Sequence, residues 1–209
     1  MAKRRPKGER RREKQRYAGR SRRRQRAWTA SVVIGAVLLA ILGLRAAGVF
    51  EPPGANVDLN AAPVAPGETI GTKVSDQGNT HIPDSQHFTY NSIPPTSGSH
   101  WQSPASWGIK DSQEPNERTT HNLEHGGIVI AYGPSLPTDD IARLKGFVRG
   151  VSGTYHKILL EPYAQLADAE IALTAWDWIL KLPGYDDTQM VKFIKVHYQS
   201  TESPEPNGF

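Results

Sequence analysis

The chain of 209 residues contains no cysteine. This absence excludes disulfides, thiolate zinc sites and cysteine nucleophiles, and it also excludes blue-copper centres, which need a thiolate ligand. A domain that folds outside the cytoplasm without disulfides must be held by its apolar core, or by that core together with a bound metal. We therefore look for metal ligands among the other side chains.

Negative charge is scarce at the start of the chain. Residues 1–26 contain 14 Lys and Arg but only Glu9 and Glu13, and residues 27–44 form an uncharged, largely apolar run of 18 residues. At ~1.5 Å per residue this run spans about 27 Å as a helix, close to a bilayer core of ~30 Å. We predict a single transmembrane helix over 27–50. The positive-inside rule then makes 1–26 a basic cytoplasmic tail and places the rest of the chain outside the cell membrane.

Other interpretations of this segment are weaker. The small residues Ala46, Ala47 and Gly48 would suit signal-peptide cleavage, but the apolar run is longer than a signal peptide needs. Ser21-Arg22-Arg23-Arg24 is a poor twin-arginine signal, because polar residues follow it. The basic tail is expected to contact anionic lipid headgroups.

The remainder of the chain has few basic residues. Of 25 Lys and Arg and 21 Asp and Glu, 14 and 2 lie in residues 1–26, which leaves 11 basic and 19 acidic residues beyond them. An acidic domain binds phosphate backbones poorly, so we exclude a nucleic-acid partner. Prolines in 51–68 indicate a Pro-rich linker, residues 69–199 are long enough for one extracytoplasmic domain, and 200–209 is predicted to be a flexible tail.

The predicted fold class is α+β. Prolines and a lack of periodicity predict a long loop-rich N-terminal half, with no helix before residue 122. In the second half, apolar runs predict strands over 127–132, 157–161 and 171–178, the last with Trp176 and Trp178 on one side. Helices are expected from 138, capped by Thr138, to 150, and after Asp186-Asp187 with Met190 and Ile194 on the apolar face. We predict one small mixed sheet with helices on one face.

Five of the seven histidines lie between positions 81 and 125. His121 and His125 are four residues apart, and His81 and His100 each follow a turn sequence. Neutral imidazoles held by preset loops suit zinc or copper. We predict a transition-metal site, copper or zinc, whose candidate ligands are His81, His100, His121 and His125, with Glu124 as a further ligand or as a group that orients one histidine.

Three alternatives to this metal site stay open. The histidines can form a hydrogen-bonded structural network in a protein-interaction module, or they can act in catalysis without a metal. His121–His125 also matches H-x-x-E-H, the motif of a class of zinc-dependent hydrolases, but that motif needs a helix, which the sequence does not predict here. His156 is predicted to lie in a loop, Met190 in the core, and His197 at a helix C-terminus where a cation is favoured. Trp101, Trp107, Trp176 and Trp178 are predicted to be core residues rather than a binding surface.

Two long motifs carry a family resemblance. The segments P-P-T-S-G-x-H-W (94–101) and H-N-L-E-H-G-G (121–127), with His81, Tyr90 and Trp107-Gly108, resemble the signature of an uncharacterised bacterial family of membrane-anchored or secreted domains of unknown function. The resemblance covers roughly residues 69–198. It implies an extracytoplasmic domain after a short anchor, and it implies no activity and no ligand residues.

Overall fold

The computed structural model describes residues 35, 39, 53–166 and 170–208. The predicted basic tail and transmembrane helix therefore lie outside the described residues, apart from Gly35 and Leu39. No helix in the described part of the chain is both long and apolar enough to cross a bilayer. Residues 52–209 form a unit of their own.

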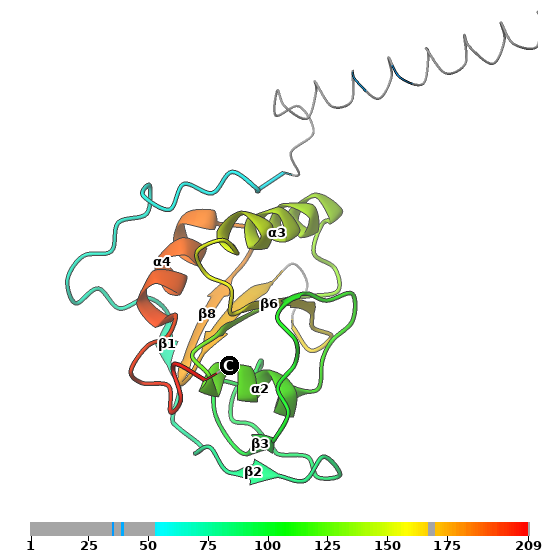
Figure 1. Cartoon of the computed structure of the whole chain (residues 1–209), viewed down its shortest axis with the longest axis vertical. Helices are drawn as coiled ribbons and strands as arrows, with labels where there is room; N and C mark the ends of the chain where they lie inside the picture. The colour runs from blue at the N-terminus through cyan, green and yellow to red at the C-terminus, as the bar shows by residue number, and fades with distance from the viewer. Residues whose placement is uncertain (1–34, 36–38, 40–52, 167–169, 209) are drawn as a thin grey trace, which may run out of the picture. The chain divides into compact units, whose positions relative to one another are not determined.

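The centre of this unit is a mixed sheet of six strands, as predicted, in the order β1-β8-β7-β5-β6-β4 (Figure 1). The strands β1, β8, β7 and β5 pair antiparallel, whereas β5, β6 and β4 pair parallel. The predicted strands 127–132 and 157–161 are confirmed as β5 and β6. The bounds are β1 Thr72–Lys73, β4 Gly108–Ile109, β5 Ile128–Tyr132, β6 Ile158–Pro162, β7 Ile171–Ala175 and β8 Trp178–Leu182.

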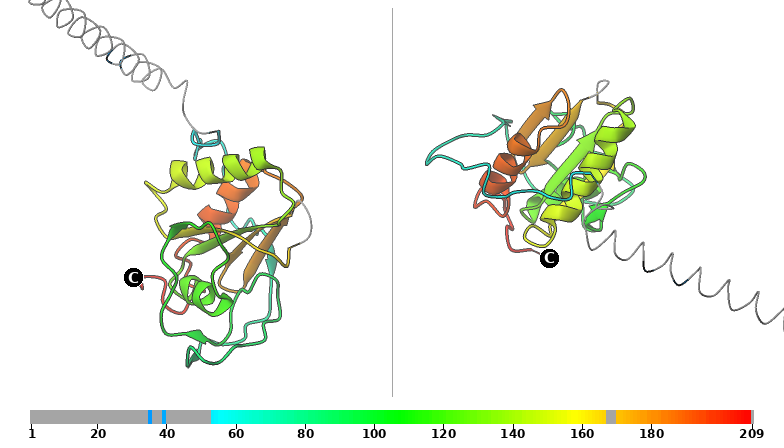
Figure 2. Two further views of the ribbon diagram at one scale, coloured as in Figure 1. Left: turned by 90° about the vertical axis from the view of Figure 1, so that its right-hand side faces the viewer. Right: turned by 90° about the horizontal axis from the view of Figure 1, so that it is seen from above.

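Helices cover both faces of the sheet, not one. Figure 2 shows α3 (Thr138–Val151) and α4 (Asp187–His197) on one face and α2 (Asn116–Glu124) on the other. Every residue of β5 is buried, so successive side chains supply two separate cores. Ile128 and Ile130 pack with α3 and α4, while Val129 packs with Leu123 of α2. A strand that is apolar on both sides requires a cover on both sides, and α2 supplies the second one.

The expectation of no helix before residue 122 is therefore wrong. The hydrophobic pattern of the sequence did not predict α2. Seven of its nine residues are buried, but only one of these, Leu123, is a large apolar residue. Polar side chains fill the other buried positions and bond inside the protein. The same half contains β2 (His81–Ile82) and β3 (His100–Trp101), which form a separate two-stranded parallel sheet.

Two details of the second half also differ from the prediction. The segment 171–178 is not one strand, because it turns at Asp177, whose φ is 62°, and continues as β8. Trp176 and Trp178 therefore pack in the two different cores. Thr138 is the first residue of α3 rather than its cap, which is Pro137. The side chain of Asp186 caps α4, since its carboxylate accepts a hydrogen bond from the Gln189 amide at 3.0 Å.

The segment expected to be a linker lies against the helices. An added Cβ on Gly146 of α3 would lie 1.9 Å from the Pro53 carbonyl oxygen, so the absence of a side chain lets the two backbones touch. Ala62 is buried, and the Lys195 amine donates to its carbonyl oxygen at 2.8 Å. Residues 53–62 thus cover α3 and α4 instead of forming a free spacer.

Candidate metal centre

The helix α2 ends at the histidine cluster because of a Gly-Gly sequence. His125 is the C-cap, and Gly126 follows with a φ of 72°, which places its amide within 2.9 Å of the Leu123 carbonyl oxygen. The ring of Trp107 packs directly on Gly127, where an added Cβ would lie 2.2 Å from it. The helix therefore includes His121–Glu124 of H-x-x-E-H and ends at the last residue of the motif, His125, contrary to the expectation that this motif lacks a helical setting.

A parallel pairing of β2 with β3 brings His81 beside His100. The register places these two residues opposite each other, and the His100 amide donates to the Thr80 carbonyl oxygen at 3.1 Å. The turn before β3 needs Gly98, whose φ is 129° and whose added Cβ would meet the Phe88 ring at 2.7 Å. The two imidazole rings lie 4.9 Å apart between centroids.

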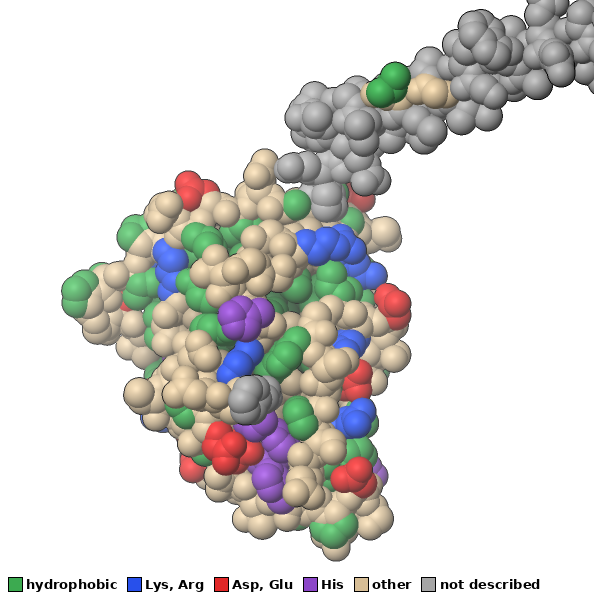
Figure 3. All heavy atoms as spheres, viewed as in Figure 1, with side chains coloured by type: hydrophobic (Ala, Val, Ile, Leu, Met, Phe, Trp, Pro, Cys, Tyr) green, Lys and Arg blue, Asp and Glu red, His purple; other side chains and the backbone are tan. Residues whose placement is uncertain are grey.

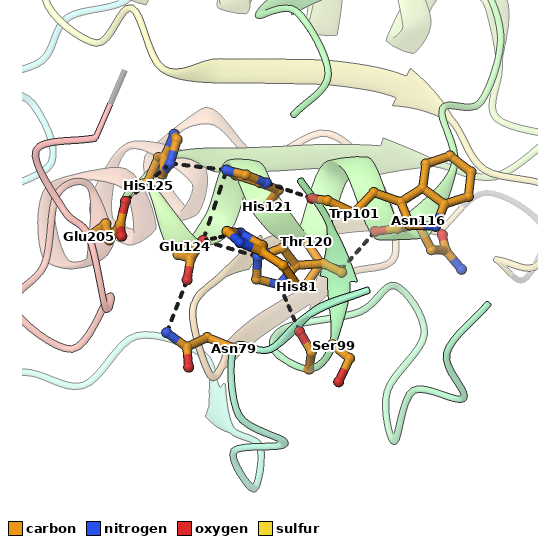
Figure 4. Close-up of polar contacts among 12 residues, drawn as sticks. Asn79, His81, Ser99, Trp101, Asn116, Thr120, His121, Glu124, His125 and Glu205 are labelled. Atoms are coloured by element: carbon orange, nitrogen blue, oxygen red, sulfur yellow. Dashed lines mark hydrogen bonds and ion pairs between the residues drawn. The ribbon is translucent and has the colours of Figure 1, made fainter. Parts of the chain in front are cut away.

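The three elements converge on one carboxylate oxygen, Oε2 of Glu124 (Figure 4). His100 Nε2 lies 3.0 Å from it, His81 Nε2 3.5 Å and His121 Nε2 3.9 Å. One ligand atom from each of these four residues lies within 4.8 Å of the others. Ligands that bind one zinc ion at ~2.0–2.2 Å lie roughly 3–4 Å apart, so the set needs little adjustment to hold an ion.

Backbone carbonyls fix the orientation of two of the rings. His100 Nδ1 lies 2.8 Å from the Gly98 carbonyl oxygen, and His121 Nδ1 lies 2.6 Å from that of Trp101. A carbonyl oxygen can only accept, so each Nδ1 carries a proton and each neutral ring presents a lone pair at Nε2. This is the arrangement that metal-binding histidines show, with the second nitrogen donating to the protein.

The charge state of the cluster follows from its surroundings. Burial lowers the pKa of His121, which favours its neutral form. Burial opposes ionisation of Glu124, but the neighbouring His100 ring, when it carries a proton on Nε2, and the hydrogen bond from the Asn79 amide at 3.0 Å hold the pKa of this carboxyl below its ordinary value. The centre therefore combines an ionised Glu124 carboxylate with a His121 ring that favours its neutral form.

The centre is buried on one side and open on the other. His100 is fully buried, and Glu124 and His121 are nearly so. The side chain of His81 is 45% exposed, which gives an ion a route to the cluster. Figure 3 shows histidine side chains reaching the surface in the lower part of the molecule, with acidic side chains beside them.

His125, the fourth predicted histidine, lies at the side of this set. Its Nε2 is 3.1 Å from His121 Nε2 and 3.5 Å from Glu205 Oε2. Glu124, His125 and Glu205 form a second group whose ligand atoms lie within 4.8 Å of one another. Glu205 was missed because it stands 80 residues after His125 in a segment predicted to be flexible. Asn79, which bonds Glu124, also had no local signal.

The remaining histidines lie elsewhere. His156 is exposed in the loop before β6, as predicted. His197 is buried instead of acting as a helix-end cation, and its Nε2 lies 2.8 Å from the Ile70 carbonyl oxygen. Burial lowers the pKa of His197, so the ring is a neutral hydrogen-bond donor. Met190 is fully buried in the core, as predicted.

The comparisons with known proteins give one match. A family model described as "Protein of unknown function (DUF3105)" matches residues 81–208, a range that contains the four residues of the metal set and the whole second group. No curated protein matches the chain, and no solved structure does. The predicted resemblance to a family of unknown function is confirmed, while membrane anchoring stays a prediction. The match covers more than half of the sequence, and the chain belongs to the DUF3105 family.

Proposed function

We propose that this protein is a membrane-anchored metal-binding protein whose outer domain holds copper or zinc through His81, His100, His121 and Glu124. The observation that carries the proposal is the fixed orientation of two buried imidazoles. Their Nδ1 atoms are bonded to backbone carbonyls, and their Nε2 atoms face one carboxylate.

Acceptor groups converge at this point. When the rings are neutral, the Nε2 lone pairs of His100 and His121 and the negative charge of Glu124 repel one another inside the protein. A single proton added to His100 forms a buried ion pair between His100 and Glu124, but this proton makes no bond to His121 or His81. In a hydrogen-bonded network His121 Nε2 would bond His125 Nε2, which lies 3.1 Å away. A divalent cation would instead contact the three nitrogens and the oxygen together, and we propose a metal on this ground.

The donor set suits two metals. Imidazole with carboxylate binds zinc in four-coordinate sites, and copper(II) binds the same donors more tightly in the Irving–Williams order. The absence of cysteine from the chain removes the thiolate ligands that would favour copper(I). The proposal therefore covers zinc and copper(II).

The proposal of a membrane anchor is supported by the amino-acid sequence before residue 51. The basic residues of 1–26 followed by an uncharged apolar run support a single-pass helix with its N-terminus in the cytoplasm and its basic tail on anionic lipid. The metal-binding domain would then lie outside the cell membrane, where disulfides are available but this chain has none.

Titration of the full-length, chelator-stripped protein in detergent with Zn²⁺ or Cu²⁺ tests the metal site. His81→Ala removes the exposed ligand and should weaken binding at this site at least tenfold. His87→Ala is the matched control, since His87 is also exposed and bonds Glu117 instead. A metal at about 100 times its dissociation constant should stabilise the wild type by about 2.7 kcal/mol. Wild-type protein that retains no ion and melts at the same temperature with and without metal would refute the proposal.

A zinc-dependent hydrolase is a second candidate, because α2 does run through His121–Glu124 and His121 and His125 nitrogens lie 3.1 Å apart. In that mechanism Glu124 would be a base rather than a ligand. Glu124→Gln separates the two roles. Unchanged metal affinity would favour the hydrolase, and a large loss of affinity would favour Glu124 as a ligand.

A further inference from the structure

The C-terminal segment returns to the end of α2. The Gln199 amide donates to the Gly126 carbonyl oxygen at 2.8 Å, and the Glu205 amide donates to that of Glu124 at 3.0 Å. Both ends of residues 199–205 are therefore bonded to the chain that carries the metal ligands. The segment is an ordered part of the domain, in contrast to the predicted flexible tail.

A buried lysine holds the end of this segment. The Lys157 side chain, on the residue before β6, donates to the carbonyl oxygens of His125 at 3.0 Å and Pro206 at 3.3 Å, and also to that of Gly208. Gly208 lies so close to the His125 ring that an added Cβ would be 2.5 Å from it. One amine thus ties the C-cap of α2 to residues 206–208 and fixes Glu205 between two anchored points.

Because the segment is anchored in this way, the carboxylate of Glu205 lies beside the proposed metal centre. Glu205 Oε2 lies 3.5 Å from His125 Nε2, and Figure 4 shows both side chains beside Glu124. One imidazole nitrogen and two carboxylate oxygens form a donor set for a divalent cation such as zinc. The Glu205 side chain is 60% exposed, so an ion can enter from solvent.

We propose that the domain binds two divalent cations side by side. The first lies among His81, His100 and His121, the second between His125 and Glu205, and Glu124 contacts both. This inference rests on the proposed function. The two donor groups share Glu124, and their nearest imidazole nitrogens, on His121 and His125, are 3.1 Å apart. Paired metal ions in proteins lie about 3.5–4 Å apart, which a shared carboxylate between neighbouring groups allows. The Glu205 carboxylate offsets part of the positive charge that the second ion adds.

The number of bound ions tests this inference. Full-length wild-type protein, stripped with chelator and titrated with Zn²⁺ alone, should retain two ions per chain by elemental analysis. Glu205→Gln and His125→Ala should each retain one. Glu202→Gln is the matched control, because Glu202 lies in the same segment but bonds Lys73 and Trp178, and it should retain two.

The outcomes separate the two proposals. No ion in the wild type overturns both. One ion in the wild type that Glu205→Gln leaves in place overturns the second position and leaves the first intact. One ion that Glu205→Gln removes shows a single site that includes Glu205, which also overturns the pair. Electron paramagnetic resonance of the Cu²⁺-loaded wild type gives an independent reading. Two adjacent ions should couple and lose signal, whereas the Glu205→Gln variant should show the full signal of one isolated ion.

Discussion

A buried carboxyl group outside the candidate metal centre makes the stability of the fold depend on pH. Glu161 on β6 is fully buried. Its Oε2 accepts a hydrogen bond from the Glu114 amide at 2.7 Å, while its Oε1 has no hydrogen-bond partner among the residues that the structure describes. Burial raises the pKa of Glu161 from an ordinary 4.5 to about 7, although the bond from Glu114 opposes this change.

The sign and size of this pH dependence follow from the linkage between proton binding and the free energy of unfolding. The folded state binds this proton more tightly than the unfolded state, so unfolding releases a proton between pH 4.5 and about 7. The free energy of unfolding therefore falls as the pH rises through this window and is constant above it. A pKa difference of about 2.5, at about 1.4 kcal/mol per pKa unit, gives a loss on the order of 3 kcal/mol.

The Glu161→Gln variant isolates this contribution, because an amide has nearly the shape of the protonated acid but does not ionise. Urea unfolding of chelator-treated wild type and variant, followed by tryptophan fluorescence, should show similar stability near pH 4.5. The variant should become more stable than the wild type by about 3 kcal/mol near pH 8.5. Other titrating groups cancel in the difference between the two proteins.

Glu202→Gln is the control of opposite sign. Hydrogen bonds from Lys73 and Trp178 lower the pKa of Glu202, so its stabilising contribution is present above the unfolded pKa and is lost as the pH falls through the folded pKa. The wild type should therefore exceed this variant in stability only at higher pH. A stability difference between wild type and Glu161→Gln that stays constant from pH 4.5 to 8.5 would refute a buried, proton-binding Glu161.

Three further measurements test the fold and the anchor. Ile194→Asp puts an unpaired charge into the core between α4 and the sheet, where Ile194 is 1% exposed, and should lower the free energy of unfolding by several kcal/mol; an unchanged melting temperature would contradict the packing of α4. Asp186→Ala removes the side-chain cap of α4 and should cost about 1 kcal/mol in urea unfolding, whereas an unchanged midpoint would show that the cap does not stabilise the helix. A reporter active only outside the cytoplasm, fused after Phe209, should be active, and a soluble mature protein that starts near Ala47 or Gly48 would instead establish cleavage.

Periodic apolar patterns in the sequence predicted the regular second half. Continuous runs such as Ile128–Tyr132 and Ile158–Leu160 identified two central strands, and Asp186 correctly marked the start of α4. These signals are local, because the spacing of apolar residues along a single strand or helix reflects the geometry of that element alone. The same pattern did not separate β7 from β8, since the turn between them consists of only Trp176 and Asp177.

The sequence also predicted most of the side chains that meet at the candidate site. Clustering of histidines and the H-x-x-E-H segment led to His81, His100, His121 and Glu124, and the structure brings these four together. The sequence could not indicate how these four residues meet. His81 and His100 are neighbours because β2 pairs with β3, and this pairing joins segments with no apolar periodicity.

Tertiary structure alone decided the features that join distant parts of the chain. The polar helix α2 forms because the second face of β5 and β6 needs a cover and because its buried polar groups find partners there. Glu205 reaches the centre because buried Lys157 fixes the C-terminal segment beside His125. Local sequence encodes the period of a helix or strand. Contacts between residues far apart in the sequence, such as Glu205 with Glu124, depend instead on which surfaces the assembled sheet leaves to be covered. The candidate metal centre is built from contacts of this second kind.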